Sequence, residues 1–178
     1  SKLFKPSGNK CENWDEDKVI QYAKKGEPNS ESIAVEELKK IIDHLYQLPR
    51  DTECYGLIHC DFAFRNFLIE EDLSTIHAID FGDLCYHWYI ADVAFSLWGA
   101  RHLPKDKRHE VLNWFMDGYR LECSLDEQWL SEFSWFIRLR TVYLFIRFTN
   151  GEWDKIKHHN QPQWIEQTRK LLSEEFIW

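Results

Sequence analysis

One stretch of the sequence restricts what the chain can form: residues 55–83, which read YGLIHCDFAFRNFLIEEDLSTIHAIDFGD. Short apolar runs alternate there with polar residues, and Asp61, Asn66 and Asp80 stand where strands would bury Leu and Ile. Asp and Asn are ordinary turn residues, so each of the three could simply shape a turn. Their combination within one short stretch is what indicates a functional site.

The apolar runs at 55–59, 67–69 and 76–80 predict three short strands, and the polar segment EEDLST between the last two predicts a hairpin. Elsewhere the apolar residues recur at helical spacing. The predicted fold class is therefore α+β and mainly α-helical, with a small β element inserted early. With no internal repeat and no linker in the sequence, residues 1–178 are expected to form a single domain.

Helical periodicity is clearest before and after the predicted strands. Residues 33–48 place apolar side chains on one face, and Pro49 is expected to end this helix. A further helix is expected within 87–100. The apolar face of the first helix consists of Ala34, Leu38, Ile41, Ile42, Leu45 and Leu48.

Three more helices are predicted in the second half of the chain. Asp106 and Asp126 are candidate N-caps of two of them, because an Asp side chain can accept the unpaired N–H groups of a first helical turn. Asn150 and Gly151 are expected to end the second. Pro162 falls in the first turn of the last helix, where its missing N–H costs nothing.

Composition excludes several classes of function. The chain has 44% hydrophobic and 29% charged residues, which is typical of a globular protein. A net charge of −8 argues against a nucleic-acid partner, and no apolar run is long enough to cross a membrane. The five cysteines are scattered without a C-x-x-C pair, which favours reduced thiols in a cytoplasmic protein and excludes a zinc site by spacing.

The polar residues of the 55–83 stretch suit a particular chemistry. Asp61 and Asn66 bound a short connection that leaves an apolar run, and Asp80 ends the run after the next turn, so the three side chains can meet. Converging oxygen atoms form a site for Mg²⁺, which usually shares its ligand shell with substrate phosphates. A carboxylate left off the metal can orient a hydroxyl or accept its proton. Phosphoryl transfer needs little more than this.

The segment HCDFAFRN, followed by AIDFGD, resembles the catalytic core of the aminoglycoside phosphotransferase and choline kinase superfamily, the phosphotransferase enzyme family. The motif of that family is H-x-D-x-x-x-x-N, followed by an apolar strand that ends in I-D-x-x-D. The resemblance covers residues 45–100. It implies the C-terminal lobe of a protein-kinase-like fold, with the small hairpin carrying the catalytic and metal-binding loops.

Matched by position, the resemblance implies that Asp61 is the catalytic base or hydroxyl-orienting carboxylate. It implies that Asn66 and Asp80 are the Mg²⁺ ligands and that ATP is the co-substrate. The expected reaction moves the γ-phosphate of ATP to a hydroxyl of a small molecule. Ala63 stands where protein kinases have a Lys, which favours a small-molecule acceptor over a protein.

Other positions have supporting roles by the same resemblance. His59 and Asp92 are expected to steady the catalytic loop, and Asp83 matches the second acidic position of the motif. The family commonly has Pro-Gly before the Asn, whereas this chain has Phe64 and Arg65. Arg65 is therefore expected to offer its charge to a phosphate.

The acceptor is expected to be an amino alcohol, an aminoglycoside or a similar amine, because a negative protein attracts a cation and aromatic faces bind one. Most aromatic residues of the second half are expected to be core, with a minority lining the acceptor pocket. The residues considered are Trp88, Tyr89, Trp98, Trp114, Trp135, Tyr143 and Trp153.

The sequence shows no Gly-rich phosphate loop: its seven glycines are isolated, and no G-x-G occurs. The nucleotide-binding N-terminal lobe is thus expected to be absent from this chain, which would be the catalytic lobe of a longer bacterial kinase and inactive by itself. Two alternatives remain open. The chain could be a catalytically incomplete lobe that binds a ligand or partner, or a metal-dependent phosphohydrolase with water as acceptor.

Overall fold

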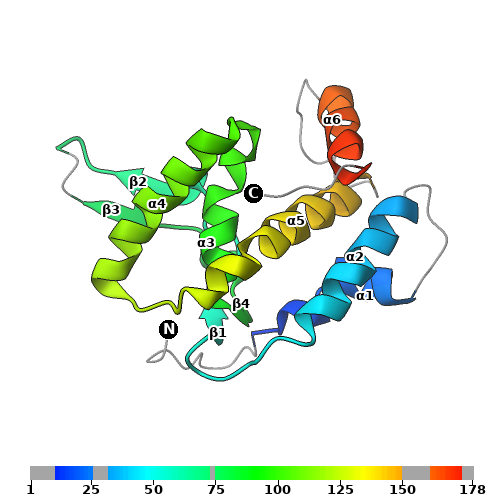
Figure 1. Ribbon diagram of the computed structural model, residues 1–178, viewed down its shortest axis with the longest axis horizontal. Coiled ribbons are helices and arrows are strands. Elements are labelled where there is room, and N and C mark those ends of the chain that lie inside the picture. The colour runs from blue at the N-terminus through cyan, green and yellow to red at the C-terminus, as the bar shows by residue number, and fades with distance from the viewer. Residues whose placement is uncertain (1–10, 26–31, 73–74, 150–160, 174–178) are drawn as a thin grey trace. The chain divides into compact units, whose positions relative to one another are not determined.

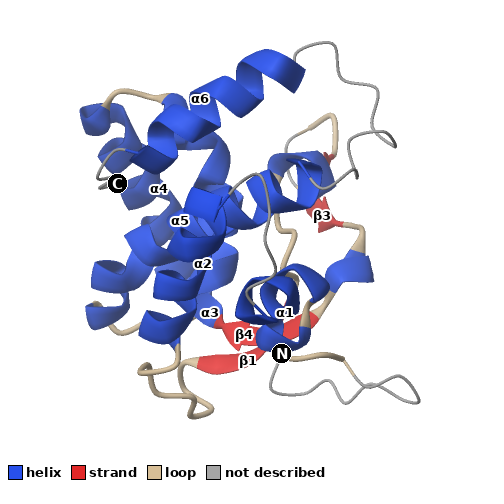
Figure 2. Cartoon of the chain, turned by 90° about the vertical axis from the view of Figure 1, so that its right-hand side faces the viewer, coloured by secondary structure: helices blue, strands red, loops and turns tan. Residues whose placement is uncertain are grey.

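The computed structural model describes residues 11–25, 32–72, 75–149 and 161–173 (Figure 1). Helices make up most of these residues, and the strands form two small two-stranded sheets (Figure 2). The main elements are α1 (Lys18–Lys25), α2 (Ser32–Leu45), β1 (Tyr55–Ile58), β2 (Phe67–Ile69), β3 (Ile76–Ala78), β4 (Cys85–Trp88), α3 (Tyr89–Leu97), α4 (Lys105–Glu122), α5 (Gln128–Thr149) and α6 (Gln161–Ser173).

The chain divides into two compact units. The first contains the described residues up to 14 and residues 49–137, and therefore holds both sheets, α3, α4 and the start of α5. The second contains residues 15–48 and those after 137, with α1, α2, α6 and the rest of α5. All of the predicted site residues belong to the first unit.

In the second unit, α2 confirms the predicted apolar face except for Leu48, which lies beyond the end of the helix and is half-buried. The buried members are Ala34, Leu38, Ile41, Ile42 and Leu45. The helix ends at Leu45 and not at Pro49, because the next residues tighten into a turn in which the N–H of Leu48 donates to the carbonyl of Leu45. Arg138 of α5 joins this helix to α6. Its Nε donates to the carboxylate of Glu37, and its Nη2 donates to the carbonyl of Leu172 at 3.2 Å.

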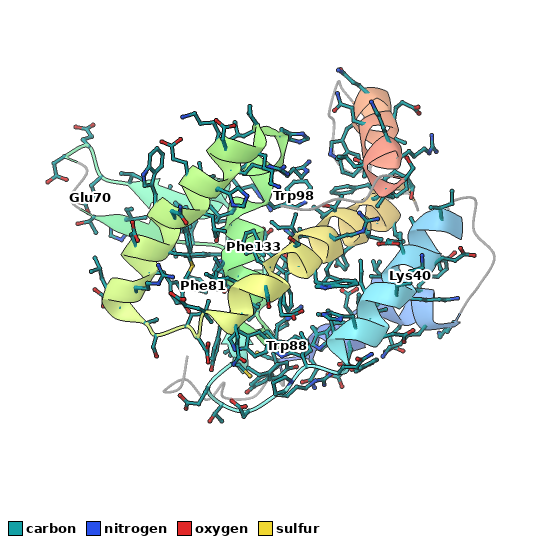
Figure 3. The ribbon with its side chains drawn as sticks, viewed as in Figure 1. Lys40, Glu70, Phe81, Trp88, Trp98 and Phe133 are labelled. Carbon is teal, nitrogen blue, oxygen red and sulfur yellow. The ribbon has the colours of Figure 1, made fainter. Side chains whose placement is uncertain are left out.

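The predicted hairpin is present in the first unit. β2 and β3 pair antiparallel, with Phe67 opposite Ala78 and Ile69 opposite Ile76, and Glu70 follows directly after β2 (Figure 3). β3 ends at Ala78, so Asp80 lies beyond the strand that was expected to contain it.

The second sheet contains a strand that the sequence did not predict. Residues 85–88 form β4, which pairs antiparallel with β1 and places His87 opposite Gly56. The helix expected within residues 87–100 follows directly, as α3 from Tyr89 to Leu97. The strand was missed because its partner lies some thirty residues earlier and its last two side chains are both buried, which removes the alternation that marks a strand.

Trp88 is the centre of the aromatic core of this unit and is fully buried (Figure 3). Its indole N–H donates to the carbonyl of Pro49 at 2.7 Å. The rings packed against it belong to Trp14, Tyr55, His87 and Phe136. Burial, aided by the positive charge of Arg50, lowers the pKa of His87 to about 3, so this histidine is a neutral member of the core.

Of the two predicted N-caps, one is confirmed and one is wrong. The carboxylate of Asp126 accepts the N–H of Gln128 at 3.0 Å, at the start of α5. Asp106 is not a cap: α4 begins one residue earlier, at Lys105, and follows Pro104, whose extended backbone starts the helix without a side-chain hydrogen bond.

The remaining helix predictions concern α5 and α6. Pro162 lies in the first turn of α6, as predicted, whereas Asn150 and Gly151 fall outside the described residues. All five cysteines are free thiols. None of the described helices is both long and apolar enough to span a membrane.

Candidate active site

The loop after β1 is held by one carboxylate. Asp92, in the first turn of α3, accepts the backbone N–H of His59 with one oxygen and that of Cys60 with the other, each at 2.8 Å. Cys60 has a φ of 65°, a left-handed conformation that costs a non-glycine residue about 1–2 kcal/mol. Asp92 thus offsets the strain of the turn from which Asp61 projects.

Asp61 and Asn66 are in direct contact, as predicted. Both are buried, and the Nδ2 of Asn66 donates to the backbone carbonyl of Asp61 at 2.7 Å and to its Oδ2 at 2.9 Å. A short 3₁₀ turn at Phe64–Asn66 brings Asn66 back toward Asp61. Because the amide nitrogen faces Asp61, the amide oxygen of Asn66 accepts no hydrogen bond from any described residue and remains available to a cation.

Arg65 contacts Asp61, which was not predicted from the sequence. Its Nη2 donates to both carboxylate oxygens of Asp61, at 2.6 and 2.5 Å. The Asp61 side chain is only 9% exposed, whereas that of Arg65 is 65% exposed. The spacing of four residues between an Asp and an Arg was the available signal, since helical turns bring such pairs together.

Two hydrogen bonds tie the segment before Asp80 to the loop of residues 59–66 that follows β1. The N–H of Ile79 donates to the carbonyl of Asn66 at 3.0 Å, and the Nε2 of His59 donates to the carbonyl of Ile79 at 2.9 Å. Asp80 follows directly, exposed and in the left-handed conformation with a φ of 63°. The backbone at Asp80 is therefore fixed relative to Asp61 and Asn66.

His59 is itself buried between two aromatic rings, with ring centroids 5.4 Å from Phe62 and 4.8 Å from Phe81 (Phe81 is labelled in Figure 3). Since a carbonyl only accepts, the proton on its imidazole must be on Nε2. Its buried Nδ1 has no hydrogen-bond partner in the described part of the chain. Packing and one hydrogen bond fix the orientation of this ring.

Asp83 ends a short 3₁₀ turn, Phe81–Asp83, and its side chain is exposed. It makes no hydrogen bond or ion pair with the described residues, in contrast to Asp92. Burial raises the pKa of Tyr119 of α4, and electrostatic interactions with Cys123 and Asp92 raise it further.

The described residues contain no group of three or more His, Cys, Asp or Glu side chains suited to hold a metal. A cation here would instead depend on the oxygen of an amide, Asn66, and the carboxylate of Asp80. Such mixed oxygen sets suit Mg²⁺, which keeps several waters and takes further oxygens from substrate phosphates.

The aromatic residues considered for the acceptor pocket differ in their burial. Trp88 belongs to the core, and the hydroxyl of Tyr143 donates to Asp17 at 3.0 Å within the second unit, where burial raises its pKa. Trp114 is 65% exposed on α4. Tyr89, Trp98 and Trp135 are half-buried, and Trp153 lies outside the described residues.

Residues 10–133 match the model of the phosphotransferase enzyme family (APH). The chain belongs to this family. Amicoumacin kinase of Bacillus subtilis (strain 168) is 30% identical over 151 residues, which are 81% of this chain and 44% of that protein.

Two solved structures share the fold. Amicoumacin kinase hAmiN, in complex with AMP-PNP, Ca²⁺ and Ami, matches 96% of this chain and 53% of its own, with a TM-score of 0.80 and 23% identity. The microcompartment-associated aminopropanol kinase matches 91% of this chain and 47% of its own, with a TM-score of 0.63 and 19% identity. The chain therefore spans about half the length of the relatives it matches.

Proposed function

We propose that the protein is a small-molecule kinase that moves the γ-phosphoryl group of ATP to a hydroxyl group, with Asp61 as the base or hydroxyl-orienting carboxylate. The observation that carries the proposal is the contact between Asp61 and Asn66, together with the two hydrogen bonds that fix the backbone before Asp80. Family membership and the kinase names of the relatives support it.

In this proposal Asn66 and Asp80 hold Mg²⁺. The amide oxygen of Asn66 is directed away from Asp61, and Asp80 is exposed beside a fixed backbone, so both fit a cation. When bound, Mg²⁺ neutralises charge on the phosphates of ATP. Asp61 is left to orient the acceptor hydroxyl and to receive its proton.

The supporting residues act through the backbone. Asp92 holds the loop that carries Asp61, and His59 holds the carbonyl just before Asp80. Asp83 is exposed and unengaged among the described residues, which leaves its carboxylate for a metal-bound water or for the substrate. A single displaced loop would therefore misplace the base and the metal ligands together.

The acceptor we propose is an amine-bearing alcohol, such as an amino alcohol or an aminoglycoside. The net charge of −8 favours a cationic ligand. The names of a relative, amicoumacin kinase, and of a structural neighbour, aminopropanol kinase, are compatible with this class.

We further propose that these residues are the C-terminal, catalytic and acceptor-binding lobe of a cytoplasmic protein, and that the nucleotide-binding lobe belongs to the complete protein. The support is that the chain matches about half of each relative. We expect residues 1–178 alone to transfer no phosphate.

The test is transfer by the complete protein, measured as ADP release with Mg·ATP and a panel of amino alcohols and aminoglycosides. Asp61→Asn should abolish transfer while nucleotide binding persists, and Asp80→Ala should weaken Mg-dependent nucleotide binding itself. Equal activity of wild type and Asp61→Asn would exclude Asp61 as the base. Phosphate release without an acceptor would favour a phosphohydrolase, and intact folding without either reaction would favour a binding module.

A further inference from the structure

Arg65 occupies a position where its family commonly has Gly, and it uses only part of its guanidinium group. Nη2 donates to both oxygens of Asp61. Nε and Nη1 donate to nothing in the described part of the chain. A guanidinium carries five N–H donors, so three of them remain unused on a side chain that is 65% exposed.

Those unused donors suit a phosphate. The N–H groups of an arginine lie in one plane as a fork, which matches two oxygens of a phosphate or carboxylate at once. Since the ion pair holds one edge of the fork against Asp61, the rest of the group is held in place beside the proposed base. An arginine fixed in this way loses less conformational entropy on binding an anion than a mobile surface arginine does.

Arg101 is a contrasting arginine that has no carboxylate partner among the described residues. It is buried, its guanidinium lies 3.3 Å from the ring centroid of Trp98, and it donates to the carbonyl of that residue at 2.9 Å. Its burial lowers its pKa to about 9. Arg65 differs because its unused donors face solvent beside a catalytic carboxylate.

A positive charge beside Asp61 would reduce an electrostatic repulsion in the proposed reaction. A buried, ionised Asp61 repels the negatively charged phosphoryl group that must approach the same hydroxyl. A guanidinium between the two anions attracts both. Protein kinases have a Lys two residues after the catalytic Asp, and this chain has Ala63 at that position. Arg65 is therefore the one positive side chain within the loop of residues 59–66.

We infer that Arg65 is a positioning residue that bridges Asp61 and the γ-phosphoryl group of the nucleotide, with Nη2 on the carboxylate and Nε and Nη1 on phosphate oxygens. The inference rests on the proposed function. Arg65 neither gives nor takes a proton in this role. It aligns the base and the transferred group and screens their repulsion.

The test compares binding of Mg·AMP-PNP and Mg·ADP to the complete protein by calorimetry. Arg65→Ala should lower the affinity for AMP-PNP roughly tenfold or more, as expected for loss of a charge-assisted hydrogen bond. The affinity for ADP, which lacks the γ-phosphate, should change less than about twofold. Arg120→Ala is the matched control, because the described partners of Arg120 are exposed carboxylates on and after α4.

A second variant and a second readout guard against simple misfolding. Arg65→Lys keeps the charge but not the fork, so it should keep the melting temperature and recover only part of the AMP-PNP affinity. In turnover, Arg65→Ala should lower kcat with little change in KM for the acceptor. Guanidinium ion added to Arg65→Ala should restore part of kcat.

Equal effects of Arg65→Ala on AMP-PNP and ADP, or no effect on either, would overturn the bridge while leaving the kinase proposal intact. Full recovery with Arg65→Lys would also overturn it, since charge alone would then suffice. A complete wild-type protein that binds neither nucleotide would overturn the proposed function, and the bridge with it.

Discussion

The Nε2–H of His59 donates a hydrogen bond to the backbone carbonyl of Ile79, 2.9 Å away and twenty residues later in the chain. His59 precedes the proposed base by two residues, and Ile79 directly precedes the proposed metal ligand Asp80. This one bond therefore joins the two segments that have to act together. It also gives His59 a role that requires no chemistry of its own.

His59→Ala should weaken Mg-dependent binding of AMP-PNP by the complete protein about tenfold, as loss of an outer partner typically does for metal ligands. The reason is that the carbonyl of Ile79 is released and the backbone at Asp80 is no longer fixed. His77→Ala is the control, since His77 of β3 pairs with Glu70 on an exposed surface. Equal binding by the two variants would show that His59 does not position Asp80.

Asp92→Ala should destabilise the fold by about 2–3 kcal/mol, because two N–H groups lose a charged acceptor and the left-handed turn at Cys60 loses its support. Asp92→Asn should be milder, since its amide oxygen still accepts one of the two. Urea unfolding gives both values. Asp106→Ala, at an exposed site in α4 with no capping role, should stay within about 0.5 kcal/mol of wild type.

Gly56→Ala should destabilise the β1–β4 sheet by about 1–3 kcal/mol. A Cβ at this position would lie 2.4 Å from the hydroxyl oxygen of Tyr89, so the ring would have to move and leave the carbonyl of Thr52. Tyr89→Phe removes the clashing oxygen. The double variant should therefore be more stable than Gly56→Ala alone, and a strictly additive result would exclude this contact as the cause.

The pH dependence of stability should include a contribution from His87. Its pKa is about 3 in the folded protein and about 6.5 when exposed, so the unfolded chain binds the proton first as pH falls. The stabilisation is complete above pH 6.5 and is lost progressively down to about pH 3. Between pH 7.5 and 5.0 the loss should be about 2 kcal/mol, at 1.4 kcal/mol for each unit below 6.5.

Urea unfolding of wild type and His87→Phe at the two pH values measures this contribution. His87→Phe should lose less stability than wild type between them, because a phenyl ring takes up no proton. A parallel decrease in the two proteins would assign the pH dependence to other groups.

Several local features could be predicted from the sequence because their causes lie within a few residues. The apolar spacing of residues 33–48 defines the buried face of α2, and the EEDLST segment joins β2 and β3. Asp126 caps α5 because the N–H that it accepts lies two residues away. The contact of Asp61 with Asn66 belongs to the same group, since a short loop closes it.

Other features depend on interactions that local sequence patterns did not predict. Residues 85–88 form β4 because β1 supplies their hydrogen-bond partners, and these four residues show no alternating pattern that would predict a strand. Asp is a preferred N-cap residue, but α4 begins at Lys105, directly after Pro104, so Asp106 already lies inside the helix.

The proposed site also combines features that the sequence predicts with features that only the tertiary structure shows. The sequence by itself determined which residues could carry the chemistry: a base, an amide and two acidic positions at motif spacing. Only the tertiary structure placed Arg65 on Asp61 and joined His59 to Ile79. The first contact depends on the side-chain conformations of two residues that are close in sequence, and the second on a backbone carbonyl twenty residues away. Local preferences select the turns, but the directions of side chains are set by what packs and bonds around them.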